Sequence, residues 1–375
     1  MGNLSDLKPF IVMDILREAN RIEDCIHMEI GEPDLEPPPA VYEYLERAVK
    51  DRKQNYTPAL GLWELREKIA EHYYNFYGIE LSPSRIAITP GTSGAFLVAY
   101  AMLLSGGKKL GIPDPSYPCY KNIAKICGGY VITINTKEEA GYKIVSEEIG
   151  KGFDVLHISS PVNPTGAVYG REEIKSIVEE CEDKGIVLIS DEIYHGLIYE
   201  GESVTALEFS DRVIVINGFS KYFCMPGFRL GWMILPEEMI RTAEIIIQNV
   251  FISAPTLSQY SALGAFDYDY LERVRETFKN RRDLLYRELR EFLEIPVRPE
   301  GAFYIWAKVD KFHNNSFELS KDILKKAKVA VTPGIDFGDN DTHKYIRLAY
   351  TRKEEELKEG AKRLKEYFLT YDNRM

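Results

Sequence analysis

Lys221 stands in surroundings that are unusual for a lysine. It follows the apolar run "VIVING" (213–218) after a short turn that includes Ser220, and the stretch around it is rich in Phe, Met and Gly. Desolvation in such surroundings lowers the pKa of a lysine, and a neutral amine can attack an aldehyde. The stretch therefore indicates either a solvated surface charge or a reactive amine.

Three further apolar runs are followed by polar side chains in the same way. They are "RIAIT" (85–89), "DVLHISS" (154–160) and "IVLIS" (186–190). The polar residues that come after them are Thr92, Ser93, Asn163, Asp191 and Tyr194. In an open parallel sheet, ligands bind beyond the carboxyl ends of the strands. We therefore expect these side chains and Lys221 to meet at one edge of a sheet.

The elements that must position these residues alternate along the chain. Short runs rich in Ile, Val and Leu are separated by helix-length amphipathic segments, which predicts a mostly parallel sheet covered by helices. The candidate strands are 85–89, 108–113, 154–160, 186–190, 213–218 and 229–235. The segment 267–293 reads as a helix long enough to bridge two domains. We predict a large domain at 41–270 and a smaller α+β domain formed by 1–40 and 271–375.

The polar residues at these strand ends have complementary chemistry. Thr92 and Ser93 open a helix, where backbone N–H groups can bind a phosphate, although a plain N-cap turn would look the same. Arg229 could give a bidentate guanidinium to that phosphate. Asp191 directly follows an apolar strand and needs a cationic partner, for which a protonated ring nitrogen would serve. Taken singly, Asp191 and Asn163 are also typical turn and capping residues.

Together these features describe a pocket for pyridoxal 5′-phosphate, a phosphorylated cationic heteroaromatic that carries an aldehyde. The motifs "SSPVNPTG", "SDEIY", "NGFSK" with Arg229, and "YIRLAY" also resemble the fold-type I aminotransferases of class I/II, from "IGEPD" (30–34) to Arg347. The resemblance, which is to the aspartate aminotransferases in particular, implies an α/β fold. It also implies a large domain with a mostly parallel seven-stranded sheet, and a homodimer with shared active sites.

The resemblance also implies a role for each matching residue. Lys221 would bond to the cofactor aldehyde and act in catalysis with Asp191 and Tyr194. Asp191 would pair with the ring nitrogen, while Asn163 and Tyr194 would bind the phenolate oxygen. Tyr117 would stack on the ring, and Tyr56 would reach the phosphate of the other subunit. The remaining residues implied for the phosphate are Thr92, Ser93, Ser220 and Arg229, and those implied for the substrate are Gly31, Asn163 and Arg347.

The predicted reaction is ping-pong transfer of an amino group between an L-amino acid and a 2-oxo acid. The resemblance favours aspartate with 2-oxoglutarate, followed by aromatic or broad specificity. A β-lyase or cyclopropane synthase would share every motif. Side-chain pockets in the family draw on both subunits and on an N-terminal segment, expected here at Phe10 to Val12.

A serine hydrolase is the competing class. The pattern Gly91-x-Ser93-x-Ala95 approximates a nucleophile elbow, and Asp191 and His343 follow it in the order of a triad. That interpretation gives no role to Lys221, Arg229 or Asn163.

The composition of the chain limits the classes of partner that it is expected to bind. The net charge of −11 argues against nucleic-acid binding. The longest apolar run, 95–104, is far shorter than the roughly 18 residues of a membrane span. Five cysteines without metal-ligand spacing predict a reducing cytoplasm and no metal site. We therefore expect a cytoplasmic enzyme that acts on small molecules.

Overall fold

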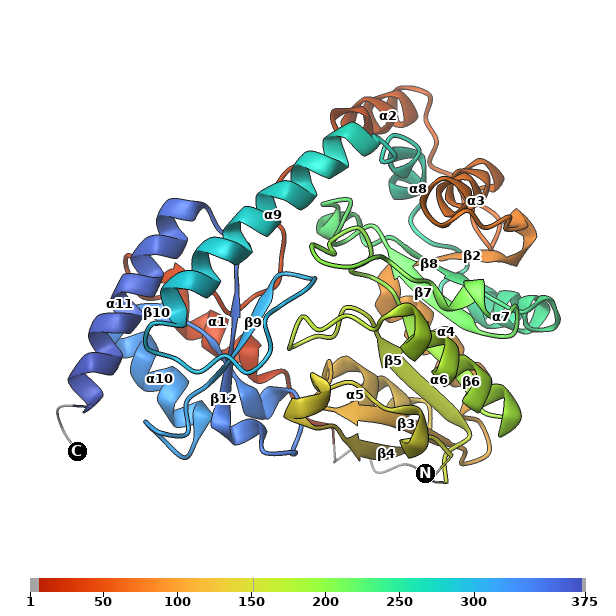
Figure 1. Ribbon diagram of the computed structural model, residues 1–375. Helices are drawn as coiled ribbons and strands as arrows, with labels where there is room; N and C mark the ends of the chain where they lie inside the picture. The colour runs from red at the N-terminus through yellow and green to blue at the C-terminus, as the bar shows by residue number, and fades with distance from the viewer. Residues whose placement is uncertain (1–6, 151, 373–375) are drawn as a thin grey trace.

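A seven-stranded sheet forms the core of the larger part of the molecule (Figure 1). The computed structural model describes residues 7–150 and 152–372. β8 runs opposite to the other six strands, which are parallel to one another, so the sheet is mostly parallel, as predicted. In spatial order the strands are β2 (Ile86–Thr89), β8 (Gly231–Ile234), β7 (Ile214–Gly218), β6 (Val187–Asp191), β5 (Val155–Ser159), β3 (Lys109–Asp114) and β4 (Tyr130–Asn135).

Each candidate strand of the sequence analysis in this part of the chain is present, and β4 is an additional one. β4 lies at the edge of the sheet, paired only with β3, and Tyr130 at its start is 65% exposed. An edge strand of this kind needs no continuous apolar run, because one side of it faces water. The run "VITI" (131–134) is nonetheless β-branched throughout, which is a strand signal that the sequence analysis missed.

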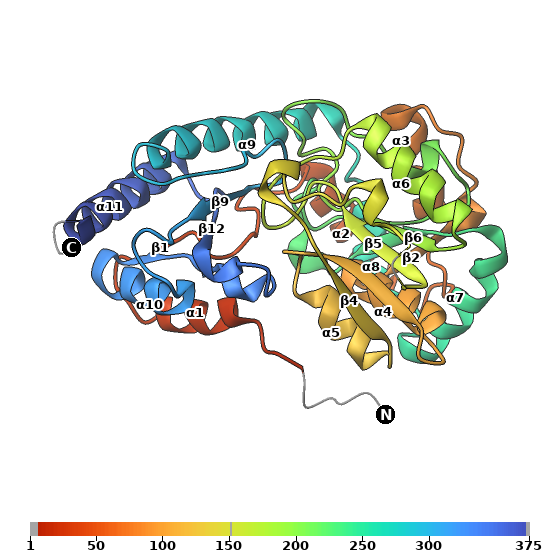
Figure 2. The same ribbon diagram turned by 60° about the horizontal axis from the view of Figure 1, so that its bottom comes forward.

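Helices cover both faces of the sheet (Figure 2). Successive residues of a strand point to opposite faces, so Ile214 and Ile216 pack in one core cluster and Val215 in the other. The face of Ile214 and Ile216 packs against α4 (Gly91–Leu103), α5 (Cys119–Ile126) and α7 (Glu237–Val250). The opposite face packs against α3 (Trp63–Tyr77) and α6 (Arg171–Asp183).

A second, smaller part of the molecule combines both ends of the chain. The three-stranded antiparallel sheet β11–β12–β9 lies there, and the early strand β1 pairs with the late strand β10. The opening segment therefore packs against the C-terminal third, as expected, while the domain bounds stay a prediction. The elements are α1 (Ile11–Ala19), β1 (Ile26–His27), β9 (Tyr304–Lys308), α10 (Ser316–Ala327), β10 (Val329–Ala330), β11 (Thr332–Pro333), β12 (Tyr345–Ala349) and α11 (Glu354–Asp372).

The long helix α9 (Tyr268–Leu289) joins the two parts. It begins beside α2 (Pro39–Lys50) and α8 (Thr256–Ala262) and runs along the smaller part to α11 (Figure 1). Its first turn is capped by Asp267, whose side chain accepts from the backbone N–H of Tyr270. In the described chain, none of the helices combines the length and the apolar character that crossing a bilayer would require.

The topology brings four strand ends to one edge. β2 and β7 both run antiparallel to β8, so they are parallel to each other and to β6 and β5. The carboxyl ends of β2, β5, β6 and β7 therefore lie on the same side. Parallel alignment of this kind is what places the residues that follow separate strands around one crevice.

Candidate active site

A cavity of about 300 Å³ lies at this edge, and its wall is completed by residues from the smaller part. Of the residues predicted for the site, only Tyr56 does not line it, and the Tyr56 side chain is 77% exposed on the surface. The residues that the cavity brings together are Gly31, Thr92, Ser93, Tyr117, Asn163, Asp191, Tyr194, Ser220, Lys221, Arg229 and Arg347. Phe10 and Val12, expected for the side-chain pocket, also line it.

The amine of Lys221 points into the cavity just beyond the end of β7. Its Nζ donates a hydrogen bond to the backbone oxygen of Gly31 at 2.7 Å. Burial lowers the pKa of Lys221 to about 8, and the positive charges of Arg347 and Arg229 act in the same direction, against Glu32. A neutral, nucleophilic amine is therefore accessible near neutral pH.

Gly31 has a steric reason to be glycine. A Cβ atom at this position would lie 1.9 Å from the hydroxyl oxygen of Tyr304. That hydroxyl in turn is hydrogen-bonded to the hydroxyl of Tyr194 at 2.8 Å. Tyr304, from β9, was not predicted, because nothing in its local sequence marks it for a site that is built mainly on the other part of the molecule.

The carboxylate of Asp191 lies at the end of β6, with 2% of the residue exposed. The Tyr120 hydroxyl donates to its Oδ2 at 2.5 Å, and the backbone N–H of Ile193 donates to its Oδ1 at 3.1 Å. Burial raises the pKa of Asp191 to about 6, and these two hydrogen bonds oppose that rise. The group is therefore ionised at neutral pH. Tyr120 was missed from the sequence; its only signal is its position three residues after Tyr117.

Arg347, on β12, is a buried cation without an anionic partner in its hydrogen bonds. Its Nη1 donates to Asn163 Oδ1 at 2.9 Å and its Nη2 to the backbone oxygen of Glu29 at 2.7 Å, both neutral acceptors. Its guanidinium carbon lies 4.1 Å from the ring centroid of Tyr304 and 4.7 Å from that of Phe337. Its Nε has no hydrogen-bond partner among the described residues. Such a group is completed by an incoming anion.

The start of α4 also has features that suit an anion. Gly91 has φ +68°, and a Cβ on it would lie 2.7 Å from Arg229 Nη2, so the guanidinium lies directly against the first turn. Thr92 and Ser93 follow in that turn and Ser220 lines the same cavity. The free N–H groups and positive dipole end of a helix favour a phosphate.

The serine hydrolase alternative is not supported by the arrangement of its residues. Ser93 and Asp191 both line the cavity, but Asp191 is hydrogen-bonded to Tyr120 and Ile193. His343 lies on the turn Thr342–Lys344 and is not part of the cavity wall. The base that a nucleophilic serine requires is therefore not beside it.

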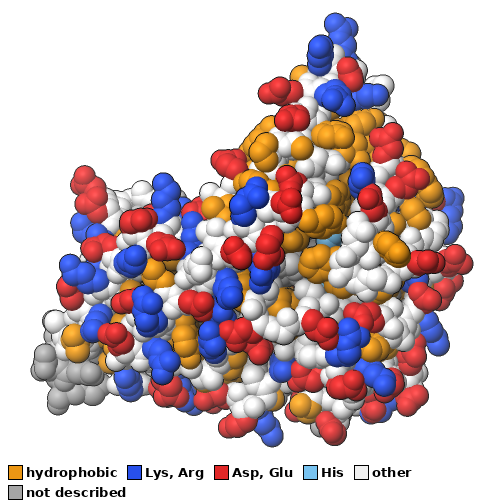
Figure 3. Space-filling model, turned by 45° about the horizontal axis from the view of Figure 1, so that its top comes forward, with side chains coloured by type: hydrophobic (Ala, Val, Ile, Leu, Met, Phe, Trp, Pro, Cys, Tyr) orange, Lys and Arg blue, Asp and Glu red, His pale blue; other side chains and the backbone are white. Residues whose placement is uncertain are grey.

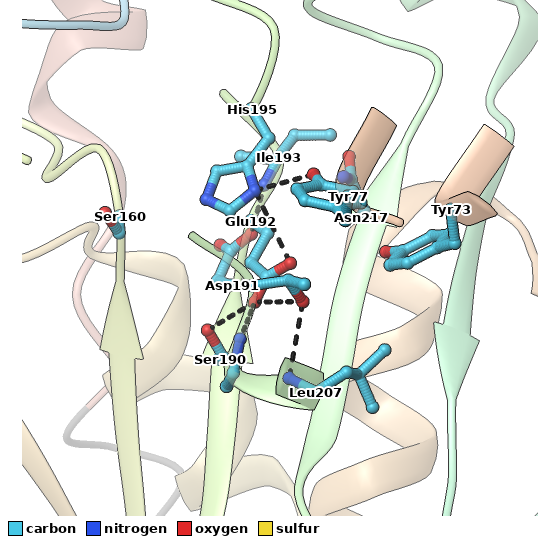
Figure 4. Close-up of polar contacts among 12 residues, drawn as sticks. Tyr73, Tyr77, Ser160, Ser190, Asp191, Glu192, Ile193, His195, Leu207 and Asn217 are labelled. Carbon is cyan, nitrogen blue, oxygen red and sulfur yellow. Dashed lines mark hydrogen bonds and ion pairs between the residues drawn. The ribbon is translucent and has the colours of Figure 1, made fainter. Parts of the chain in front are cut away.

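Glu192, next to Asp191, is completely buried and was given no role by the sequence analysis. Its Oε1 accepts hydrogen bonds from Ser190 Oγ at 3.0 Å, Thr205 Oγ1 at 3.1 Å and the backbone N–H of Ala206 at 3.0 Å. Figure 4 shows the carboxyl group at the centre of this cluster. Glu192 thus ties the strand end that carries Asp191 to the segment around Thr205.

The second oxygen of Glu192 faces a histidine. His195 Nδ1 lies 3.5 Å from Glu192 Oε2 and is hydrogen-bonded to the Tyr77 hydroxyl at 2.8 Å (Figure 4). Burial raises the pKa of Glu192 to about 8 and lowers the pKa of His195 to about 3. Both groups are therefore neutral in most molecules at pH 7, which avoids the cost of burying a charge.

We expect the free energy of unfolding of Glu192→Gln to fall less than that of the wild type between pH 5 and pH 8.5. The pKa of Glu192 in the folded state, about 8, lies above its ordinary value of 4.5, so its contribution is full below pH 4.5 and is lost as the pH rises to about 8. At about 1.4 kcal/mol per pKa unit, the loss is on the order of 5 kcal/mol. The measurement is the free energy of unfolding in urea at pH 5 and pH 8.5.

Exposed Glu179 on α6 provides the control for this prediction. Glu179→Gln should keep the wild-type difference in unfolding free energy between the two pH values. An equally large difference in Glu192→Gln would show that Glu192 is already ionised in the folded protein.

Comparisons with known proteins agree with this geometry. The sequence profile of the family described as aminotransferase class I and II matches residues 23–364. The (5-formylfuran-3-yl)methyl phosphate transaminase of Methanocaldococcus jannaschii is 36% identical, over 97% of this chain and 98% of that protein. The probable aspartate aminotransferase of the same organism is 33% identical, with the same coverage.

The fold agrees as well. An aminotransferase from Mycobacterium tuberculosis superposes with a TM-score of 0.95 and 30% identity, over 99% of both chains. The match confirms the fold-type I architecture that the motifs implied. With the profile covering nearly the whole chain and relatives above 30% identity over nearly all of it, the chain belongs to the class I and II aminotransferase family.

Proposed function

We propose that this chain binds pyridoxal 5′-phosphate and moves an amino group between an L-amino acid and a 2-oxo acid in two half-reactions at one site. The observation that carries the proposal is the pairing of Lys221 with Arg347 in one cavity. One is an amine whose pKa is lowered to about 8, and the other is a buried guanidinium with an unpaired Nε. An amino acid carries an amino group and a carboxylate, which would lie beside Lys221 and Arg347 respectively.

The residues present fit the cofactor. The start of α4 with Arg229 suits a phosphate, and the ionised Asp191 suits a protonated ring nitrogen. When bound, the cofactor supplies an aldehyde to which amines attach and a ring that takes up electron density from the substrate Cα. We assign its contacts to Thr92, Ser93, Ser220 and Arg229 for the phosphate, Asp191 for the nitrogen, Asn163 and Tyr194 for the phenolate oxygen, Tyr117 for the ring face and Lys221 for the aldehyde.

Lys221 has a second task in this proposal. Its Nζ would take the proton from the substrate Cα and return it to the cofactor carbon that carries the aldehyde. A base works best when its pKa lies close to the working pH, and the pKa of Lys221 is about 8. Tyr194, held by Tyr304 at 2.8 Å, keeps its hydroxyl in a defined position. The wall formed by both parts of the molecule limits the access of water to the reacting carbon.

Arg347 is assigned to the carboxylate on the substrate Cα. Its position is set by Asn163 and Glu29 from two separate segments and by the rings of Tyr304 and Phe337. A planar guanidinium held in this way offers a fork that matches a carboxylate. Gly31, which lies in the same wall, is assigned to the same end of the substrate.

The proposed transfer of an amino group does not specify which side chain the substrate carries. The expected pair of aspartate and 2-oxoglutarate stays a prediction, since the relatives' names point in different directions. One is named for aspartate and the other for a furan-methyl phosphate. Relatives that differ in this way support the transfer of an amino group and leave the side chain open.

We further propose a homodimer in which Tyr56 reaches the cofactor phosphate of the partner. Tyr56, Tyr42 and Leu257 are exposed large apolar side chains in neighbouring segments, and Thr256 Oγ1 bonds to the backbone of Asn55. Figure 3 shows hydrophobic side chains gathered around a hollow below the tip of the molecule. Exposed apolar surface of this kind is typical of a protein interface.

A cytoplasmic location is likewise a proposal, based on cysteine usage.

The visible spectrum of the purified protein, followed as single amino acids are added, tests the proposed function. The loaded protein should lose its aldehyde-dependent absorbance and release the matching 2-oxo acid in a stoichiometric first half-reaction. Release of ammonia with a 2-oxo acid would instead show a β-lyase. A colourless protein that binds no cofactor would refute the proposal.

Arg347→Ala should lower kcat/KM for every amino acid by roughly 10²–10³ or more, whatever the side chain. Removing one partner of a buried pair of charges typically costs about 3–5 kcal/mol, and every amino acid carries the same Cα carboxylate. Steady-state kinetics with three amino acids of different side chains measures it. Arg241→Ala, on the exposed surface of α7, is the control and should change nothing. A loss confined to dicarboxylic substrates would place Arg347 at the distal group instead.

A further inference from the structure

The wall of the cavity includes Phe337, which comes from the smaller part of the molecule. Its ring centroid lies 4.7 Å from the guanidinium carbon of Arg347, the group assigned to the substrate carboxylate. Asp336 lines the same wall and accepts from the backbone N–H groups of Ile11 at 2.9 Å and Val12 at 3.2 Å. The position of this segment therefore sets the surroundings of the guanidinium.

The segment continues into residues 337–341, a loop that contacts the larger part of the molecule and is called here the clamp loop. The backbone N–H of Ser116 donates to the backbone oxygen of its first residue at 2.9 Å. The side-chain amide of Asn340 donates to the backbone oxygens of Asp114 at 3.0 Å and Thr136 at 2.9 Å. These acceptors lie at the carboxyl ends of β3 and β4, so the clamp loop joins the smaller part to the edge of the large sheet.

The side chain of Asp114 lies at the centre of this contact, and only 1% of the residue is exposed. Its Oδ2 accepts from the backbone N–H of Asp339 at 3.1 Å, and its Oδ1 accepts from that of Asn340 at 3.3 Å. The amine of Lys121, on α5, lies 3.0 Å from Oδ2. Hydrogen bonds to an ionised group are stronger than those between neutral groups. One buried carboxylate thus fixes two consecutive amides of the clamp loop.

Gly338 allows the backbone of the clamp loop to lie directly against this carboxylate. A Cβ atom on Gly338 would lie 1.7 Å from Asp114 Oδ1, and the three atoms nearest to it all belong to the carboxyl group of Asp114. A side chain at this position would therefore push the loop and the carboxylate apart.

We propose that Asp114 is a positioning residue, which holds the clamp loop on the larger part and thereby fixes Phe337 against Arg347 for binding of the substrate carboxylate. The inference rests on the proposed function, because it takes Arg347 as the carboxylate site. The residues that one chain contributes to the cofactor come from the larger part, whereas Arg347 comes from β12 of the smaller part. Loss of the clamp should therefore weaken binding of the amino acid and leave binding of the cofactor unchanged.

Hydrogen exchange of the cofactor-loaded protein tests the clamp directly. In Asp114→Ala the amides of Asp339 and Asn340, followed in peptides that span the clamp loop, should exchange at least about tenfold faster than in the wild type. Asp339→Asn is the matched control, because it removes a carboxylate from the same loop that is 83% exposed and pairs with Lys8. Its amides should stay protected once intrinsic rates are corrected for. Exchange as slow in Asp114→Ala as in the wild type would overturn the proposal.

Steady-state kinetics separates a positioning role from a general loss of structure. In Asp114→Ala, KM for the amino donor should rise about tenfold while kcat stays within about threefold, because ground state and transition state lose the same binding. The equilibrium constant for binding pyridoxal 5′-phosphate should keep its wild-type value. A fall in kcat with KM unchanged, or weaker binding of the cofactor, would contradict the positioning role.

The two proposals fail in different ways. A wild-type protein that transaminates no amino acid refutes the proposed function, while the exchange rates still decide whether Asp114 holds the clamp loop. A wild type that transaminates, with KM unchanged in the variants, upholds the proposed function and overturns the positioning role.

A second variant reaches the same contact from the side of the loop. Gly338→Ala places a methyl group against the carboxylate of Asp114 and should also raise KM about tenfold. When Asp114 is already alanine the methyl group has room, so Gly338→Ala should then change KM by less than about threefold. Should Asp114→Ala not fold, Asp114→Asn takes its place in each measurement. Equal effects of Gly338→Ala in both backgrounds would overturn the proposal.

Discussion

Lys221→Ala is expected to lose turnover by at least about 10⁴-fold while the protein still binds pyridoxal 5′-phosphate. The substitution removes both the amine that meets the aldehyde and the base that takes the proton from Cα. The phosphate and ring contacts assigned to Arg229 and Asp191 remain. Turnover with excess amino acid and the equilibrium binding of the cofactor, measured side by side, separate the two effects.

Chemical labelling can also identify which lysine reacts with the cofactor. Borohydride treatment of the cofactor-loaded protein followed by peptide mapping should label Lys221, and a label on another lysine would contradict the assignment. Lys143→Ala is a control, because that amine is paired with Glu173 outside the cavity. Because the pKa of Lys221 is about 8, capture of added cofactor should speed up as the pH rises from 7 to 9.

Asp191→Ala should slow the proton transfer at Cα by about 10²–10⁴, or roughly 3–5 kcal/mol of barrier. Opposite charges about 3 Å apart at an effective dielectric near 20 interact by roughly 5 kcal/mol, part of which desolvation cancels. What remains keeps the ring nitrogen protonated, and without Asp191 that proton is lost. Single-turnover kinetics with one amino acid, together with the absorbance of the bound cofactor, measures both consequences.

The conservative variant Asp191→Glu separates the effect of the carboxylate charge from the effect of the side-chain shape. Asp191→Glu should lose much less than Asp191→Ala, since the carboxylate is kept. In the cofactor-free protein Asp191 should take up a proton as the pH drops below about 6, whereas the protonated ring nitrogen should hold its pKa lower in the loaded enzyme. An alanine variant that works within a few-fold of the wild type would mean that Asp191 only terminates its strand.

The parts of the site that could be predicted lie directly after strands. Asn163, Asp191 and Lys221 each follow a continuous apolar run, and parallel strands end at a common edge. Tyr120, Tyr304 and Asp336 line the same cavity but lack such a local mark. A tyrosine in a helix or a buried strand looks like any core residue until the packing shows what its hydroxyl contacts.

The sequence by itself determined six of the seven strands of the large sheet and the edge at which Asn163, Asp191 and Lys221 meet. All of these depend on short-range periodicity and turn residues, which are readable over a few positions. The surroundings of Arg347 and Asp336 were decided only by the tertiary structure. Arg347 bonds to Asn163 across 184 residues of sequence, and Ile11 bonds to Asp336 across 325. The first contact joins the smaller part to the larger, and the second joins the two ends of the chain within the smaller part. No local pattern encodes which side chains such distant segments bring together at the cavity.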